Sequence, residues 1–592
     1  MNVFDANITH KVSDFLNEIL KNTDLSKTVN QILYAQFGII CFFDNDSELT
    51  ELKRAISFEC NTLNEPNRAG YGDFQTNLNL ANHVALRLLS KNILPDVVIE
   101  PTCGKGNFIL ASLKHFHKTK TIYGIEIYKP YVWECKFNII DFYLENPQAN
   151  KPDISIMHSN VFDFNFRQIK QKHSNEKILI VGNPPWVTNS KLSCLNSDNL
   201  PKKTNFKNHN GIDAITGKGN FDIAEYITTS LIETFKDTDT NMALLVKNTV
   251  IKNIVFEQQR NKYSVSDIEK YGIDSKKEFN VSVDASLFYC KLNLRTEYEY
   301  NCAEFDFYAN AKPVKRFGWV GKKYVSNVDN YLYTKEIDGE SPFVWRQGLK
   351  HDCSAVMELE RSGSRYINGL NEKIELENDL VYSLLKSSDL KNTVINQPRK
   401  FTIVTQKNTG QETNYIKQNY PKIYQYLFAH KADFETRKSS IYNNKPPFSI
   451  FGIGDYSFAP YKVAISGLYK TCHFTLVLPF EKKPVMLDDT CYFIGFNKLE
   501  YAVYALILLN SEKVMSFLQS ITFSDAKRTF TKDVLMRIDL FKLATEFGEY
   551  EIRNELIKLN ETYNCNLTLD LWDKFIAQMN PIMNMQTELE FA

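Results

Sequence analysis

Long apolar runs are missing from this sequence of 592 residues. No stretch of about 18 uninterrupted apolar residues occurs, which excludes a conventional membrane-spanning helix. The N-terminal run MNVFDANITHKVSDFLNEIL contains acidic residues and lacks a basic segment followed by an apolar one, so we expect no secretory signal. An excess of charge is also missing, because 70 lysines and arginines balance 70 aspartates and glutamates. A nucleic-acid surface would therefore have to come from local segregation of charge.

Cysteine pairing motifs are missing as well. The eleven cysteines form no Cys-x-x-Cys pair and have no regular spacing, so neither a zinc site nor a disulfide framework is predicted. We expect reduced thiols in a cytoplasmic protein that binds no metal. At roughly 150 residues per domain, the length predicts two to four compact units.

Strand-like and helix-like runs alternate between about residues 72 and 295. The strand-like runs lie at 97–100, 122–127, 154–158, 178–182, 242–247 and 286–292. This alternation predicts an α/β fold with a doubly wound, mostly parallel, Rossmann-like sheet. Residues before it have the periodicity of an amphipathic helix, and residues after it form short aromatic-rich strands followed by helical runs. We therefore expect a helical support segment over 1–70, an α/β domain over 71–295 and an α+β region over 296–592.

A glycine-containing turn follows the first of these strands, in VVIEPTCGKGNF. Gly104 and Gly106 let the backbone turn tightly and approach a ligand at the carboxyl end of the strand. Glu126 ends the next strand, where a carboxylate can accept hydrogen bonds from two ribose hydroxyls. The combination predicts a nucleoside-binding pocket. The candidate cofactor-binding residues are Thr76, Glu100, Pro101, Cys103, Gly104, Gly106, Glu126, Asn160 and Val161.

Two of these candidates come from outside the turn and its following strand. Thr76 lies in GDFQTNLNL, before the first strand, and its hydroxyl could reach the carboxylate of a cofactor; a plain helix cap is the alternative. Asn160 follows the third strand in HSNVF and can accept a hydrogen bond from an amine.

The most specific motif in the chain is Asn183-Pro184-Pro185-Trp186, directly after the apolar run ILIVG. Two consecutive prolines cannot extend a central strand, so we expect a rigid, extended exit at the ligand-binding edge of the sheet. The Asn183 side-chain oxygen and the Pro184 carbonyl could accept both N–H bonds of an aromatic amine, which would localise the nitrogen lone pair for attack on a sulfonium methyl. Trp186 offers a ring face for an unstacked base. A simple turn is the alternative.

Taken in order, GDFQT, EPTCGKG, IEI, SNVF and NPPW resemble the gamma class of adenine-N6 DNA methyltransferases of bacterial restriction-modification systems, over about residues 72 to 295. The resemblance implies a class I S-adenosylmethionine-dependent methyltransferase domain, a C-terminal target-recognition domain and a double-stranded DNA substrate. It also implies a flipped base that is held at Asn183, Pro184, Pro185 and Trp186, with Phe279 as a second stacking aromatic. Family habit favours adenine, because relatives that act on cytosine N4 more often begin this motif with serine. Asn160 departs from the family, which usually has an acidic residue there.

Residues 391–470 form the clearest basic stretch, with twelve basic and four acidic side chains and many interleaved aromatics. Such a composition suits neutralisation of a DNA backbone combined with shape-fitting contacts; a solvated basic face is the alternative. The resemblance places the target-recognition domain in this half of the chain. The candidate DNA-binding residues are Lys400, Arg437, Lys438, Lys445 and Lys462.

Other functions fit parts of the same sequence. A fused restriction enzyme would need a nuclease domain before the first motif, so we expect any nuclease to be a separate chain. Methylation of cytosine N4, an RNA base or a protein glutamine amide would use the same Asn-Pro-Pro-aromatic motif. A non-catalytic, DNA-binding subunit of a defence complex would not need intact Gly104, Gly106 and Asn183.

Overall fold

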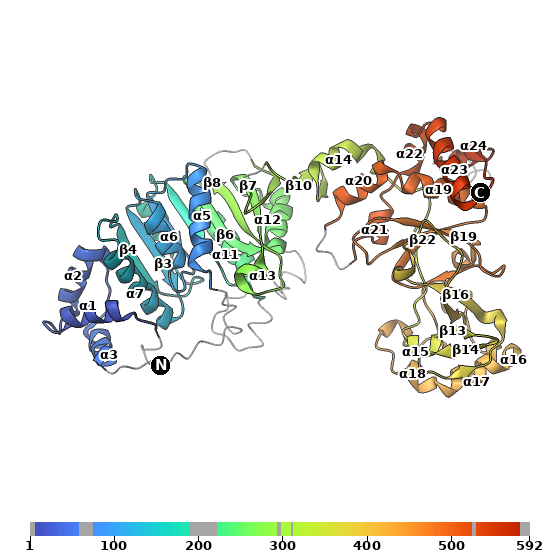
Figure 1. The fold of residues 1–592 in the computed structure, drawn as a ribbon, viewed down its shortest axis with the longest axis horizontal. Helices are drawn as coiled ribbons and strands as arrows, with labels where there is room; N and C mark the ends of the chain where they lie inside the picture. Colours follow the sequence, from blue (N-terminus) through green and yellow to red (C-terminus); the bar gives the residue numbers. More distant parts are fainter. Residues whose placement is uncertain are drawn as a thin grey trace. The chain divides into compact units, whose positions relative to one another are not determined.

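The computed structural model describes residues 6–57, 75–188, 222–292, 298–309, 312–523 and 528–580 (Figure 1). The chain divides into two compact units, Met1–Tyr324 and Val325–Ala592, which we call unit 1 and unit 2. Within the described ranges, none of the helices combines the length and the apolar character needed to cross a membrane.

Unit 1 is built on one large sheet with the strand order β1-β4-β3-β2-β5-β6-β8-β7-β9-β10-β11. The six strands from β1 to β6 in this order run parallel, whereas β8 pairs antiparallel with both β6 and β7. The strands are β1 (Ile39–Ile40), β2 (Val97–Glu100), β3 (Thr121–Glu126), β4 (Asp153–His158), β5 (Ile178–Gly182), β6 (Thr240–Lys247), β7 (Val265–Ile273), β8 (Ala285–Leu292), β9 (Asn301–Asp306), β10 (Lys315–Val320) and β11 (Lys323–Val325). The predicted α/β doubly wound fold is confirmed.

Helices connect the parallel strands of unit 1. They are α5 (Leu78–Ser90), α6 (Asn107–His115), α7 (Lys129–Glu145), α8 (Phe166–Lys172), α11 (Ile223–Phe235) and α12 (Asn248–Asn261). Every residue of the apolar strands β2 and β5 is buried, as expected for parallel strands that are covered on both faces. From β2 the chain runs outward through β3 and β4, and it then returns to β5 and β6 on the other side of β2. Such a reversal creates a ligand-binding crevice at the carboxyl ends of the two central strands.

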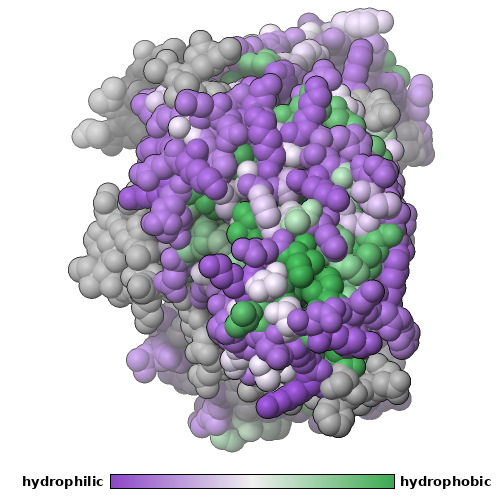
Figure 2. Space-filling view, turned by 90° about the vertical axis from the view of Figure 1, so that its left-hand side faces the viewer, coloured by the Kyte–Doolittle hydropathy of each residue, from purple (hydrophilic) through white to green (hydrophobic). Residues whose placement is uncertain are grey.

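The N-terminal segment of unit 1 contains α1 (His10–Leu20), α2 (Ser26–Phe37) and α3 (Asp46–Ser57), in agreement with its predicted helical character. It also contributes a strand that was not predicted, because β1 pairs in parallel with β4 and extends the sheet. Figure 2 shows the face at the left of Figure 1 as mainly hydrophilic, interrupted by a group of apolar side chains. The exposed large apolar and aromatic side chains of this segment are Leu25, Tyr34 and Ile40.

The sheet of unit 1 continues beyond the expected end of the catalytic domain at residue 295. Strand β9 pairs in parallel with β7 and antiparallel with β10, so residues up to Tyr324 belong to the same compact unit. The short helix α13 (Ser275–Phe279) lies between β7 and β8.

Unit 2 contains two smaller sheets with the orders β12-β22-β19-β20-β17 and β15-β14-β13-β18-β16-β21. Their strands are β12 (Arg346–Gln347), β13 (Glu358–Ser362), β14 (Arg365–Asn368), β15 (Lys373–Ile374), β16 (Val381–Leu385), β17 (Val394–Ile395), β18 (Lys400–Ile403), β19 (Tyr461–Ser466), β20 (Phe474–Val477), β21 (Met486–Leu487) and β22 (Cys491–Phe496). Helix α17 (Pro421–Ala429) buries Ile423 and Leu427 in one core with Leu359 and Ile403 of the six-stranded sheet. Helix α19 (Leu499–Leu509) lies against the five-stranded sheet.

The remaining α-helices of unit 2 range in length from 4 to 15 residues. They are α14 (Val328–Thr334), α15 (Ser354–Met357), α16 (Tyr415–Asn419), α18 (Lys431–Glu435), α20 (Glu512–Ile521), α21 (Lys532–Leu535), α22 (Leu540–Glu546), α23 (Glu549–Tyr563) and α24 (Trp572–Met579). Strands and helices are thus mixed in this unit, as the sequence predicted.

Candidate active site

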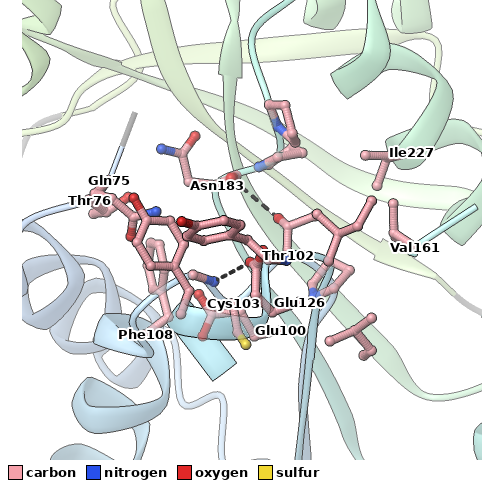
Figure 3. A pocket seen from close by; sticks show the side chains of 18 of the residues that line it. Gln75, Thr76, Glu100, Thr102, Cys103, Phe108, Glu126, Val161, Asn183 and Ile227 are labelled. Atoms are coloured by element: carbon pink, nitrogen blue, oxygen red, sulfur yellow. Dashed lines mark hydrogen bonds between the residues drawn. The ribbon is translucent and has the colours of Figure 1, made fainter. Parts of the chain in front are cut away.

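A pocket of about 890 Å³ opens at the carboxyl ends of β2, β3, β4 and β5 (Figure 3). It lies where the order of the sheet reverses, which is the position that open α/β sheets use for ligands. Its lining includes Gln75, Thr76, Glu100, Pro101, Thr102, Cys103, Gly104, Asn107, Phe108, Glu126, Tyr128, Tyr131, Ser159, Val161, Phe162, Asn183, Pro184, Pro185, Ile223 and Ile227. Most of the predicted cofactor residues and the first three residues of the Asn-Pro-Pro motif therefore meet in one cavity.

The turn after β2 requires both of its glycines. Gly104 and Gly106 have φ angles of 50° and 85°, in the left-handed region that other residues rarely adopt. A Cβ atom on Gly104 would lie 2.5 Å from the Gln75 side-chain oxygen, and one on Gly106 would lie 2.5 Å from the Cys135 sulfur. Gly104 lines the pocket, whereas Gly106 lets α6 begin against α7. The two glycines thus bring backbone close to a ligand and a helix close to its neighbour.

Glu126 fixes the other side of this turn. One carboxylate oxygen accepts a hydrogen bond of 2.8 Å from the Gly104 amide, and the other accepts one of 2.7 Å from the Tyr128 amide. Each carboxylate oxygen has a second lone pair, so the pocket-lining carboxylate can still accept from ligand hydroxyls. Glu126 is 8% exposed, and its orientation is set before any ligand binds.

Two buried oxygens of the pocket have no hydrogen-bond partner among the described residues. They are Oε2 of Glu100 and Oγ1 of Thr76, whose residues are 3% and 6% exposed. Burial, the neighbouring Cys135 and the charge of Glu126 raise the pKa of Glu100 well above its ordinary value. The Thr76 carbonyl accepts a hydrogen bond of 2.7 Å from the Asn107 side-chain nitrogen, which holds this segment at the start of α6. Buried polar atoms normally have partners, so both oxygens indicate a polar ligand.

The Asn-Pro-Pro segment leaves β5 directly above the turn. The Thr102 hydroxyl donates a hydrogen bond of 3.3 Å to the Asn183 carbonyl, which ties the two loops together. Asn183, Pro184 and Pro185 all line the pocket (Figure 3). The backbone oxygen of Asn183 is thus occupied, while its side chain lies at the pocket.

Trp186 and Phe279, the two predicted stacking aromatics, contact each other. Their ring centroids are 4.9 Å apart and their planes are inclined by 67°. Trp186 is 7% exposed, its indole N–H donates a hydrogen bond of 3.0 Å to the Leu245 carbonyl, and neither ring lines the pocket. A flat base between two rings needs roughly twice the carbon contact distance of ~3.5 Å. The structure therefore brings the pair together but leaves no slot between the rings.

Asn160 was expected to contact the cofactor, and this expectation needs correction. Its side-chain oxygen accepts a hydrogen bond of 3.0 Å from the Phe162 amide, and Asn160 does not line the pocket. Its neighbours Ser159, Val161 and Phe162 do. The local turn made by an asparagine explains the difference, and Phe162 is a lining aromatic that the motif comparison missed.

The predicted DNA-binding residues of unit 2 differ in their surroundings. The prediction that Lys462 contacts DNA needs correction. Lys462 is only 1% exposed, and its side-chain nitrogen donates a hydrogen bond of 2.7 Å to the Ala459 carbonyl. The Arg437 guanidinium lies over the Tyr442 ring and donates a hydrogen bond of 2.8 Å to the Ser449 carbonyl. These contacts stabilise the loop to which Arg437 belongs. Lys400 pairs with Glu358 at 3.2 Å.

Lys438 and Lys445 are exposed, and no partner of their side chains occurs within the described part of the chain. Of the predicted set, these two lysines are the ones best placed to neutralise phosphates.

Comparison with known proteins supplies the remaining findings. Residues 62–269 match the family model described as N-6 DNA Methylase. The chain is 39% identical over 481 residues to the Type II methyltransferase M.NspV of Nostoc sp. (strain ATCC 29411 / PCC 7524), an alignment that covers 81% of this chain and 98% of that protein.

Two solved structures are similar over nearly the whole chain. The Type IIL restriction-modification enzyme MmeI, solved in complex with DNA, has 11% identity and a TM-score of 0.46, covering 98% of this chain and 91% of its own. The type IIG restriction endonuclease BpuSI has 12% identity and a TM-score of 0.38, covering 98% and 75%.

Proposed function

This chain belongs to the N-6 DNA methylase family as a DNA methyltransferase of the modification type, and we propose that it transfers a methyl group from S-adenosylmethionine to adenine N6 within a short double-stranded sequence. The observation that carries the proposal is the shared cavity. The Asn183-Pro184 segment and the candidate cofactor-binding residues at the ends of β2 and β3 line the same pocket.

The residues of the pocket fit S-adenosylmethionine. Glu126 offers a pre-oriented carboxylate to two ribose hydroxyls, while the buried oxygens of Glu100 and Thr76 can meet the polar amino-acid end. Val161 and Phe162 form an apolar wall suited to a flat base. When bound, S-adenosylmethionine supplies a methyl group on a positively charged sulfur.

Asn183 and Pro184 would act on the amine of the target base. Their two oxygens can accept both N–H bonds, which directs the nitrogen lone pair out of the ring system and toward the methyl donor. The target amine is inaccessible inside a duplex, so the base must be flipped out. Because Trp186 and Phe279 are in contact, the flipped base can be sandwiched only after the two rings separate.

We expect binding of S-adenosylmethionine to strengthen as the pH rises above the ordinary pKa of a glutamate side chain. Burial raises the pKa of Glu100, so the free pocket holds this carboxyl protonated at low pH. A cofactor that carries an ammonium and a sulfonium favours the ionised carboxylate. The Glu100 carboxyl must therefore release its proton when the cofactor binds. Affinity therefore rises with pH, by at most about tenfold per pH unit, until the pH exceeds the pKa of Glu100 in the free protein.

Calorimetry in two buffers of different ionisation enthalpy measures this proton release directly. Glu100→Gln should bind more weakly and lose the pH dependence. An unchanged pH profile in Glu100→Gln would refute the assignment.

We propose that unit 2 binds the DNA backbone through Lys438 and Lys445, and that their joint replacement by alanine lowers the salt dependence of binding. If each lysine neutralises one phosphate, the slope of log K against log salt should fall by about two. Anisotropy of a labelled duplex between about 50 and 200 mM salt measures this slope. Lys422→Ala is the matched control, because Lys422 is exposed but already paired with Glu375. If the slope fell equally in the double variant and in Lys422→Ala, the proposal would be contradicted.

The proposed reaction is tested by expressing the chain in a host without adenine methylation and sequencing its DNA with a modification-sensitive single-molecule method. Methylated adenine at one short motif supports the proposal and defines the target. Methylated cytosine N4 would keep the chemistry and change the base. An unmodified genome, with protein that binds S-adenosylmethionine, would overturn the proposed substrate.

A further inference from the structure

The carboxylate of Glu278 joins three segments at the rim of the candidate active site. Its Oε2 accepts a hydrogen bond of 3.0 Å from the Asn77 side-chain nitrogen, and its Oε1 accepts one of 2.8 Å from the Tyr308 hydroxyl. Asn77 is 201 positions away in the sequence. No motif marks Glu278, and its role follows from what lies beside each partner.

Asn77 belongs to the segment that forms the cofactor side of the pocket. Its side-chain oxygen caps α5 by accepting a hydrogen bond of 2.8 Å from the Leu80 amide, which leaves its nitrogen for Glu278. The preceding residue, Thr76, lines the pocket and has a buried hydroxyl with no partner among the described residues, and its carbonyl is held by Asn107. The position of Thr76 is therefore fixed from α6 on one side and from Glu278 on the other.

Glu278 also precedes Phe279, the ring on the base side. Helix α13 has only five residues and is followed by Asn280 in the left-handed conformation, so the helix itself gives Phe279 little support. Asp274 caps its start by accepting hydrogen bonds of 3.1 Å from the Lys276 and Lys277 amides. Near its end, the Glu278 carboxylate accepts hydrogen bonds from the side chains of Asn77 and Tyr308. Phe279 must move if it is to separate from Trp186.

We propose that Glu278 is a positioning residue that couples the two halves of the site: it holds the Gln75–Asn77 segment in place for the cofactor and sets where Phe279 stands for the base. Order imposed on one segment by its ligand then lowers the cost of ordering the other, which makes the two binding events cooperative. The inference rests on the proposed function, because it takes S-adenosylmethionine and a flipped base as the two ligands.

The test compares Glu278→Ala, Glu278→Gln and Asn77→Ser, with Glu233→Ala as the control. Serine keeps the cap of α5 and removes the donor to Glu278, and glutamine can still accept from Asn77. Glu233 is an exposed glutamate of α11 that pairs with Lys236. Binding of S-adenosylhomocysteine without DNA, kcat, KM for DNA and the melting temperature are measured for each.

We expect Glu278→Ala and Asn77→Ser to weaken binding of S-adenosylhomocysteine by about three- to tenfold and to lower kcat. Because coupling between two sites is reciprocal, KM for DNA should rise as well, with the melting temperature unchanged. The double variant Glu278→Ala, Asn77→Ser should bind S-adenosylhomocysteine no more weakly than the weaker of the two single variants. Glu278→Gln should recover most of the lost affinity. Unchanged binding in Glu278→Ala, or a Glu278→Gln variant as weak as Glu278→Ala, would overturn the inference. A chain that binds S-adenosylhomocysteine but methylates no DNA would contradict the proposed function alone, since the binding comparison does not depend on methylation.

Discussion

Replacing Asn183 by alanine is expected to reduce methylation by at least about a hundred- to a thousandfold while binding of S-adenosylmethionine and DNA persists. The side-chain oxygen of Asn183 is one of the two acceptors that we propose for the target amine, and losing one pre-oriented polar contact of this kind costs about that factor in turnover. Cofactor binding should survive because Glu100, Thr76 and Glu126 line the pocket from other segments of the chain. Single-turnover methylation of a duplex that carries the identified motif measures the loss.

The control for this experiment is Asn146→Ala, an exposed asparagine at the end of α7 whose side chain bonds only its own helix in the described structure. It should methylate at the original rate. If Asn183→Ala kept more than about a tenth of the rate, the amine-holding role would be refuted. Losing one of two acceptors for the amine should lower the rate by more than about tenfold.

The central fold and most of the pocket could be predicted because each depends on short-range sequence. Strands β2 and β5 are continuous apolar runs, and Gly104 and Gly106 occupy backbone conformations that favour glycine. The two strands end at the same edge of a parallel sheet, so motifs 80 residues apart were expected to meet there. The N-6 DNA Methylase match covers the same part of the chain.

Side-chain orientation was not predictable from the same patterns. Trp186 could have faced a base, but its indole N–H finds the Leu245 carbonyl, and Phe279 covers its ring. Asn160 could have faced a ligand, but a local turn to Phe162 uses its oxygen. The Glu278 contacts depend on Asn77 and Tyr308, which no spacing rule relates to α13. In each case a long-range or local hydrogen bond decides between orientations that the sequence permits equally.

The basic stretch shows the same limit for charge. Composition counts Lys462 with Lys438 and Lys445, although Lys462 lies in β19, where every residue from 462 to 466 is buried. Arg399 and Lys422 pair with carboxylates from elsewhere in unit 2. A local excess of positive charge therefore overstates what the folded surface can offer to DNA.

Replacing Lys462 by methionine is expected to stabilise unit 2 at neutral pH, with a gain that disappears as the pH rises toward 10. Burial lowers the pKa of Lys462 to about 7 in the folded chain, from an ordinary value of 10.5. Between these two values the unfolded chain binds more protons than the folded one. The stability of the unaltered protein therefore increases with pH in this window, by at most about 1.4 kcal/mol per pH unit, whereas below pH 7 the full cost of burying the charge remains.

Methionine has a similar length and no charge, so Lys462→Met removes this cost and with it the pH dependence. Urea unfolding of both chains at about pH 7 and pH 9.5 measures the difference, with Lys470→Met, an exposed lysine just beyond β19, as the control that should change stability little. A gain that shrinks at high pH identifies the buried ammonium as its source. A gain of equal size at both pH values would instead assign it to apolar packing against Phe493, because removing a charge brings no advantage once the lysine itself is neutral.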